Sequence, residues 1–211
     1  MEEYIVPQLI KYQSIDNLLK KNNKARSLFE SDEKLSIDQL LQEDVVCIVG
    51  EPGIGKSRLV DEIRNHSSKN TLFFSTASQF APKSVPEDSE FCIIDALDEV
   101  EGLNFFSTLQ SIKEYKGENP DVKVLFTCRK HYVASYASYF ASCDNLIFVE
   151  LCRLSDMDVT EVINGCSEIT KANIAKSAKL KELLTIPRYL TFLLEFEKQR
   201  GSISSISDLF E

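Results

Sequence analysis

Three separate segments of the chain carry residues whose types and spacing can do phosphate chemistry. The first is "GEPGIGKSR" at positions 50–58, which matches the pattern G-x-x-x-x-G-K-[ST] through Gly50, Gly55, Lys56 and Ser57. An apolar run precedes it and an amphipathic segment follows it. In that setting glycines let the backbone turn its N–H groups toward anionic oxygens, and a helix N-terminus adds positive potential. The segment therefore predicts a cradle for the phosphates of a nucleotide.

Each position of this segment, the P-loop (residues 50–57), has an expected part in binding. Lys56 is expected to reach the β- and γ-phosphates, and the Ser57 hydroxyl is expected to bind Mg²⁺. The remaining nucleotide-binding positions contribute backbone and shape, and they are Gly50, Glu51, Pro52, Gly53, Ile54, Gly55 and Arg58. The alternative, a tight strand-to-helix turn without a ligand, is much the weaker interpretation beside a full match.

The second segment is "FCIIDALDE" at 91–99, in which an apolar run ends in acids. Asp95 is expected at the carboxyl edge of a parallel strand, where ligands of α/β sheets bind, and there it can share Mg²⁺ with Ser57. Either Glu99 or Asp98 can orient or deprotonate the water that attacks a phosphate, and Glu99 is the preferred candidate. The alternative is that these acids only line a solvated helix N-terminus.

The third segment is "VLFTCR" at 124–129, an apolar run that ends in a hydroxyl and a guanidinium. We expect Thr127 to contact the attacking water or the γ-phosphate, and Arg129 to respond to the presence of that phosphate. Thr and Arg are also common at strand ends for structural reasons alone. A fourth segment, "TIPRYL", offers Pro187, for which a proline-started core helix is a sufficient explanation.

The elements that must position these residues follow from the pattern of apolar runs. Five short, strongly apolar runs alternate with amphipathic segments, which predicts a parallel sheet covered by helices on both faces. The expected strands are 45–49, 71–75, 91–95, 122–127 and 145–150, and the expected helices between them are 57–68, 100–116 and 129–140. The segment 76–90, with two prolines, is expected to be a loop.

The sequence also predicts how the chain is divided. A helical lead-in is expected over 1–43, the nucleotide-binding core over 44–152, and a helical subdomain over 153–211 that continues in a longer protein. Ser36 and Ser155 are expected helix N-caps, with Asp158 completing a capping box at the second. The helices expected in the subdomain are 154–166, 171–185 and 187–200.

The composition limits the cellular environments and the binding partners to be expected for this chain. The 211 residues are 43% hydrophobic and carry a formal net charge of −9, which argues against a broad nucleic-acid or anionic-membrane surface. The N-terminal segment lacks the pattern of a secretory signal, and no apolar run approaches the length of a membrane span. The six cysteines contain no C-x-x-C pair, so reduced thiols in a cytoplasmic protein are expected.

Taken together, these motifs resemble the STAND class of P-loop ATPases, and within it the NACHT-like and bacterial immune members. The resemblance runs from about Leu35 to Leu194 and implies a three-layer α/β fold with a five-stranded parallel sheet in the order 5-1-4-3-2. It also implies an ATP/ADP- and Mg²⁺-dependent switch in signalling or antiviral defence, which hydrolyses slowly and self-associates according to its nucleotide. Sensor and effector parts are expected outside this chain.

The resemblance carries one further expectation and leaves alternatives open. The family's G-x-P motif contacts the adenine; here Pro187 matches its proline, and Thr185 stands in place of its glycine. An AAA+-like ATPase that remodels or loads a macromolecule is the main alternative, and Arg153 and Arg188 are candidate arginines for either class. A small-molecule kinase and a non-catalytic nucleotide-binding scaffold are the others.

Overall fold

A computed structural model of the chain describes residues 8–20, 33–66, 72–100, 102–143 and 145–203. These residues divide into two compact units. The sheet unit holds Leu9–Glu51 and Lys56–Leu151, and the helical unit holds Gln8, Pro52–Gly55 and the described residues from Cys152 on. Each unit is built around its own set of buried side chains.

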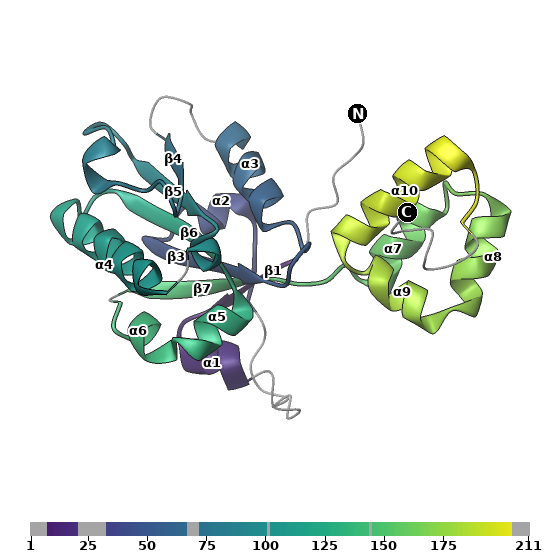
Figure 1. The fold of residues 1–211 in the computed structure, drawn as a ribbon, viewed down its shortest axis with the longest axis horizontal. Helices are drawn as coiled ribbons and strands as arrows, with labels where there is room; N and C mark the ends of the chain where they lie inside the picture. The colour runs from purple at the N-terminus through teal and green to yellow at the C-terminus, as the bar shows by residue number, and fades with distance from the viewer. Residues whose placement is uncertain (1–7, 21–32, 67–71, 101, 144, 204–211) are drawn as a thin grey trace. The chain divides into compact units, whose positions relative to one another are not determined.

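The sheet unit is a seven-stranded sheet in the order β2-β1-β7-β3-β6-β5-β4 (Figure 1). The strands are β1 (Leu9–Tyr12), β2 (Glu33–Leu35), β3 (Val45–Gly50), β4 (Leu72–Thr76), β5 (Phe91–Asp95), β6 (Lys123–Arg129) and β7 (Leu146–Leu151). The last five are parallel to one another. Counted along the chain, they take the order 5-1-4-3-2, which is the order that the family resemblance implies.

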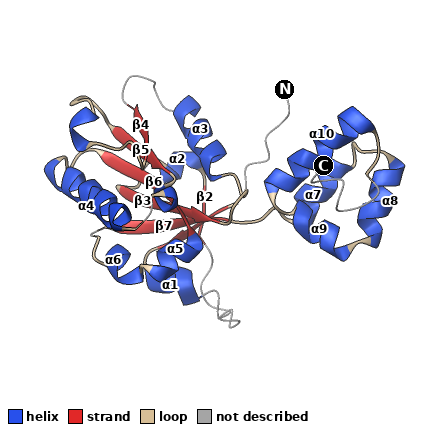
Figure 2. Cartoon of the chain, in the orientation of Figure 1, coloured by secondary structure: helices blue, strands red, loops and turns tan. Residues whose placement is uncertain are grey.

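Helices connect most of the strands along the chain (Figure 2). They are α1 (Ile15–Lys20), α2 (Ile37–Leu40), α3 (Lys56–His66), α4 (Leu103–Glu118), α5 (Lys130–Ser135) and α6 (Ala137–Ala141), with short 3₁₀ turns η1 (Pro82–Ser84) and η2 (Leu97–Glu99). Right-handed crossovers place α3 on one face and α4, α5 and α6 on the other. The resulting architecture is the α/β three-layer sandwich of P-loop NTPases.

The helices of the second face meet in an aromatic cluster. Phe105 of α4 packs against Tyr136, with ring centroids 4.8 Å apart, and against Phe140 of α6. Phe140 in turn contacts Phe126 of β6 and Phe148 of β7. Burial of such large rings contributes several kcal/mol to the layer, so α4, α6 and the centre of the sheet are held as one body.

The N-terminal region differs from the helical lead-in expected over 1–43. It contains helices α1 and α2, but it also contributes β1 and β2, which extend the sheet beyond the expected five strands. β1 pairs antiparallel with β7, Leu9 opposite Leu151, and β2 pairs antiparallel with β1. The physical reason is that β7 would otherwise expose an unpaired edge, which β1 covers. Positions 1–7 and 21–32 of the expected lead-in lie outside the described residues.

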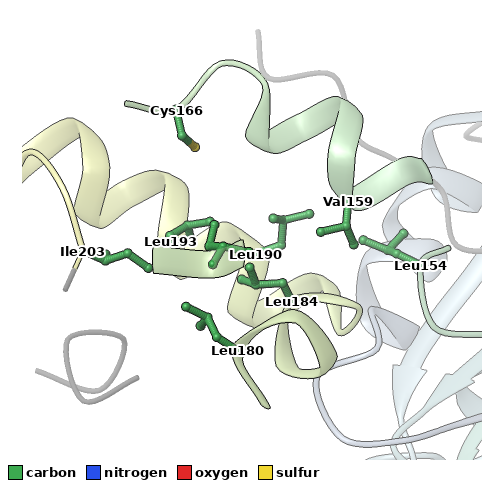
Figure 3. Close-up of a cluster of buried hydrophobic side chains, with 9 residues drawn as sticks. Leu154, Val159, Cys166, Leu180, Leu184, Leu190, Leu193 and Ile203 are labelled. Carbon is green, nitrogen blue, oxygen red and sulfur yellow. The ribbon is translucent and has the colours of Figure 1, made fainter. Parts of the chain in front are cut away.

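The described residues of the helical unit form a bundle of four helices, α7 (Asp156–Ile163), α8 (Glu168–Lys176), α9 (Ala178–Leu184) and α10 (Pro187–Arg200). Figure 3 shows the apolar cluster between them, in which Leu180, Leu184 and Leu193 are almost fully buried. The expected helix over 171–185 is two helices, because Ser177 ends α8 and caps α9, accepting a hydrogen bond from the Leu180 N–H.

Three local predictions about helix starts are confirmed. Ser36 and Ser155 each form a capping box, the second with Asp158, and Pro187 occupies the first turn of α10. Among the described residues, no helix is long and apolar enough to cross a bilayer.

Candidate nucleotide site

The P-loop leaves β3 at Gly50 and enters α3 at Lys56, the strand-to-helix setting that the motif requires. Gly53 has φ +77° and Gly55 has φ +102°, values that residues with a side chain rarely adopt. Ile54 between them is buried. The two glycines therefore set the turn of the loop.

Lys56 lies over the start of its own loop. Its Nζ donates hydrogen bonds to the carbonyl oxygens of Gly50, at 3.1 Å, and of Glu51, at 3.3 Å. Burial lowers the pKa of the Lys56 ammonium below its ordinary value; the Asp98 carboxylate opposes this shift and the Arg129 guanidinium adds to it. The ammonium thus lies in the electrostatic range of the acids and of the arginine at the neighbouring strand ends.

The register of the sheet brings these strand ends together. Gly50 of β3 lies opposite Arg129 of β6, and β6 lies between β3 and β5. The carboxyl end of β5 carries Asp95, so the three predicted motif segments end at one edge of the sheet. The sequence predicts this proximity only if the strand order is known, and the order is what the structure supplies.

Thr127 joins β6 to β5 through its hydroxyl group. Its Oγ1 donates to Oδ1 of Asp95 at 2.5 Å and accepts the backbone N–H of Ala96 at 2.8 Å. The side chain is 0% exposed. The hydroxyl has one proton and donates it to Asp95, so this geometry favours positioning of Asp95 over the expected contact with water or phosphate.

The two candidate acids after Asp95 have different surroundings. The Asp98 side chain is buried and ion-paired with Arg129, whose Nε lies 2.8 Å from Oδ2. Glu99 is exposed and lines a pocket of about 590 Å³ together with Ser78, Asn104 and Ser107. A base that activates water needs access to water, a condition that exposed Glu99 meets and buried Asp98 does not. The lining of the Glu99 pocket includes no P-loop residue.

Asp95 and Ser57 carry the kind of side-chain atom that binds Mg²⁺. Both offer oxygen ligands, and Ser57 is exposed in the first turn of α3. Oδ1 of Asp95 is held by Thr127, which fixes the direction of the carboxylate. The residues therefore fit a metal that bridges the protein to a bound phosphate.

The remaining predicted residues lie around the loop or in the helical unit. Glu51, Pro52 and Arg58 are exposed. Within the helical unit, Gly53 accepts the backbone N–H of Arg188 at 3.2 Å, and a Cβ added to Gly53 would stand 3.1 Å from Cβ of Arg188. Pro187, the residue before Arg188, thus starts a helix whose first turn contacts the loop residue Gly53. Arg153 lies 3.6 Å from Glu182 in an ion pair.

Burial raises the pKa of the Cys47 and Cys128 thiols, on β3 and β6. Sequence reasoning missed one feature of this site, which is Ala96. This residue follows Asp95 in the left-handed region at φ 60°, ψ 50°. No local sequence pattern signals a left-handed alanine.

Comparison with known proteins supports the fold. A comparison with models of protein families found no match, and a comparison with curated proteins found none. Among solved structures, the chain is similar to a DNA replication initiation factor, with 17% identity, a TM-score of 0.54, and coverage of 78% of this chain and 59% of that chain. It is also similar to the replication initiator DnaA bound to AMPPCP and single-stranded DNA, with 15% identity, a TM-score of 0.52, and coverage of 78% and 60%.

A third similar structure is a variant of RuvB from Thermotoga maritima, with 13% identity, a TM-score of 0.50, and coverage of 94% of this chain and 70% of that chain. At these identities the likeness concerns the fold alone. The chain spans about 60% of the length of the two replication proteins. The likeness supports the α/β three-layer fold, with the P-loop between β3 and α3.

Proposed function

We propose that this chain is the ATP-binding and slowly hydrolysing switch module of a STAND-type signalling or antiviral defence protein, whose nucleotide state controls oligomerisation. The observation that carries the proposal is the convergence of three motif ends, at Lys56, Asp95 and Arg129, on one edge of the sheet. A phosphate chain bound there meets one mobile ammonium, one guanidinium and the oxygen ligands of a metal.

The role proposed for each residue follows from the contacts of its side chain. Phosphate oxygens take the place of the Gly50 and Glu51 carbonyls as acceptors for the Lys56 ammonium. Asp95 and Ser57 hold Mg²⁺, which neutralises phosphate charge when bound. Glu99 accepts a proton from water at the pocket beside η2. Arg129 contacts the terminal phosphate, and the family resemblance assigns the adenine contact to Pro187.

The test is a titration of the purified chain with a fluorescent ATP analogue and the matching ADP analogue, with and without Mg²⁺. Magnesium-dependent binding that Lys56→Ala abolishes supports the nucleotide site. Size-exclusion chromatography with light scattering, in ATP and in ADP, then tests the switch. An oligomer that forms with ATP and not with ADP supports it, and the same mass in both nucleotides contradicts it.

The alternative function is an AAA+-like ATPase that loads or remodels a macromolecular partner. Its support is the similarity to replication initiators, one of which was solved with single-stranded DNA. The net charge of −9 opposes a nucleic-acid partner. A fluorescent single-stranded oligonucleotide that binds in the presence of ATP favours this alternative, and its failure to bind favours the switch.

A further inference from the structure

Asp98 holds Arg129 at two points. Its Oδ1 accepts the backbone N–H of Arg129 at 2.9 Å, and its Oδ2 lies 2.8 Å from Nε of the same residue. One carboxylate thus fixes both the main chain at the end of β6 and the first nitrogen of the guanidinium.

Burial differs sharply across this pair. The Asp98 side chain is 3% exposed, whereas that of Arg129 is 39% exposed. A buried carboxylate is stable only when its charge is matched and its oxygens are hydrogen-bonded, and Arg129 meets both needs. Asp98 therefore faces inward, and its partner extends from it toward solvent.

The point of attachment determines how the guanidinium is presented. This group is planar and rigid, so fixing Nε fixes the plane in which the two terminal nitrogens lie. The ion pair is made at Nε, which shares one edge of the planar group with one terminal nitrogen, so the other terminal nitrogen lies away from that edge. Gly50, where the P-loop begins, lies directly across the register from Arg129.

We propose that Asp98 is a positioning residue that holds the Arg129 guanidinium with a terminal nitrogen toward the γ-phosphate, so that the Asp98–Arg129 pair determines the preference for triphosphate over diphosphate. This inference rests on the proposed nucleotide site. Asp98 acts through Arg129 and does not itself contact the nucleotide. Its charge also opposes the effect of burial on the Lys56 ammonium, so the same carboxylate supports both cations.

Two other roles for Asp98 make different predictions. If Asp98 were a general base, Asp98→Asn would slow hydrolysis and leave the preference for ATP unchanged. A simple negative charge near phosphates would, once removed, tighten ATP at least as much as ADP, because ATP carries more charge. Only a positioning role lowers the ratio of the ADP to the ATP dissociation constant.

The experiment measures the ratio of ADP to ATP dissociation constants for four forms of the chain, with fluorescent analogues of both nucleotides. The forms are the natural chain, Asp98→Asn, Arg129→Ala and the double variant, and the matched surface control is Glu87→Gln. We expect a ratio of roughly ten to a hundred in the natural chain, because one charge-assisted hydrogen bond to the γ-phosphate changes an affinity by about that factor. Asp98→Asn should lower that ratio to the value of Arg129→Ala, and the double variant should lower it no further.

Several results would overturn the inference. They are a natural ratio near one, an Asp98→Asn ratio equal to the natural one, or effects that add in the double variant. If the natural chain binds neither nucleotide, the proposed function itself fails, which is a distinct outcome. If Asp98→Asn does not fold, Arg129→Lys replaces it, because lysine pairs with Asp98 but has no second nitrogen to present. The ratio for Arg129→Lys should match that of Arg129→Ala. A ratio equal to that of the natural chain would overturn the inference.

Discussion

The Thr127 hydroxyl lies between the Asp95 carboxylate and the Ala96 backbone N–H, donating to the first at 2.5 Å and accepting from the second at 2.8 Å. Ala96 has a left-handed backbone, a conformation that costs an alanine about 1 kcal/mol or more and needs support from its surroundings. A single side chain of β6 thereby fixes both the turn after β5 and the direction of the candidate metal ligand.

Thr127→Val keeps the shape of the side chain and removes both hydrogen bonds. We expect it to reduce the gain in ATP affinity that Mg²⁺ provides by roughly tenfold, because the Asp95 carboxylate is no longer held. Affinity without Mg²⁺ should change little. The measurement is a nucleotide titration at fixed low and high Mg²⁺, and Thr127→Ser, which keeps the hydroxyl, should restore most of the gain. An unchanged Mg²⁺ dependence in the valine variant would show that Asp95 is positioned without Thr127.

Lys56→Met should weaken ATP binding by roughly a hundredfold or more, because it removes the ammonium from the phosphate cradle while keeping an unbranched chain of similar length. Lys56 donates to main-chain carbonyls of its own loop, so the fold should tolerate the change. Isothermal titration with ATP and Mg²⁺ measures the effect. Lys179→Met, at an exposed position of α9, is the control and should bind normally. Equal affinities in the two variants would remove Lys56 from the site.

Glu99→Gln should retain ATP affinity within a few-fold and slow hydrolysis by about a hundredfold or more, because the amide cannot accept a proton from water. Phosphate release in a single turnover separates this effect from binding. Glu87→Gln, at an exposed position outside the site, should hydrolyse ATP at the natural rate. Normal turnover in the Glu99 variant would move the role of base to another group.

The parts of this site differ in how far the sequence could predict them. The P-loop, the five parallel strands and the Ser155 capping box depend on residues within one segment, so local patterns predict them. β1 was missed because it is only four residues long and pairs with β7 about 140 positions away. Asp98 and Glu99 differ in burial just after the left-handed turn at Ala96, and residue types alone do not determine such a turn.

Gly53→Ala and Gly117→Ala should change stability in opposite directions. At Gly53 the new Cβ would combine a φ of +77° with a 3.1 Å approach to Arg188, so we expect a loss of about 1–2 kcal/mol. Gly117 lies in α4 with no heavy atom within 4 Å of an added Cβ, so alanine there should add about 0.5–1 kcal/mol through its helix propensity. Urea unfolding of both variants measures the difference. A stabilised Gly53→Ala would contradict the loop geometry.

Glu197 of α10 should make the stability of the helical unit depend on pH. Its Oε1 accepts the Ser167 N–H at 2.6 Å and its Oε2 accepts the Thr170 hydroxyl at 2.6 Å, which ties α10 to the start of α8. Burial raises the pKa of the Glu197 carboxyl, but these hydrogen bonds and the Lys171 ammonium outweigh burial, and the net pKa is lowered.

Because the pKa of Glu197 is lower in the folded chain than in the unfolded one, its ionised form adds stability above about pH 4.5, near the ordinary value of a glutamate. That contribution should disappear as the pH falls from there through the lowered, folded-state pKa. Glu197→Gln should cost about 1 kcal/mol at pH 7 and progressively less at lower pH. Thermal unfolding of both chains between about pH 7 and pH 3 measures this convergence, and Glu195→Gln, at an exposed position, is the control. A destabilisation by Glu197→Gln that stays constant across this range would show that the carboxylate charge contributes nothing to the packing of α8 on α10.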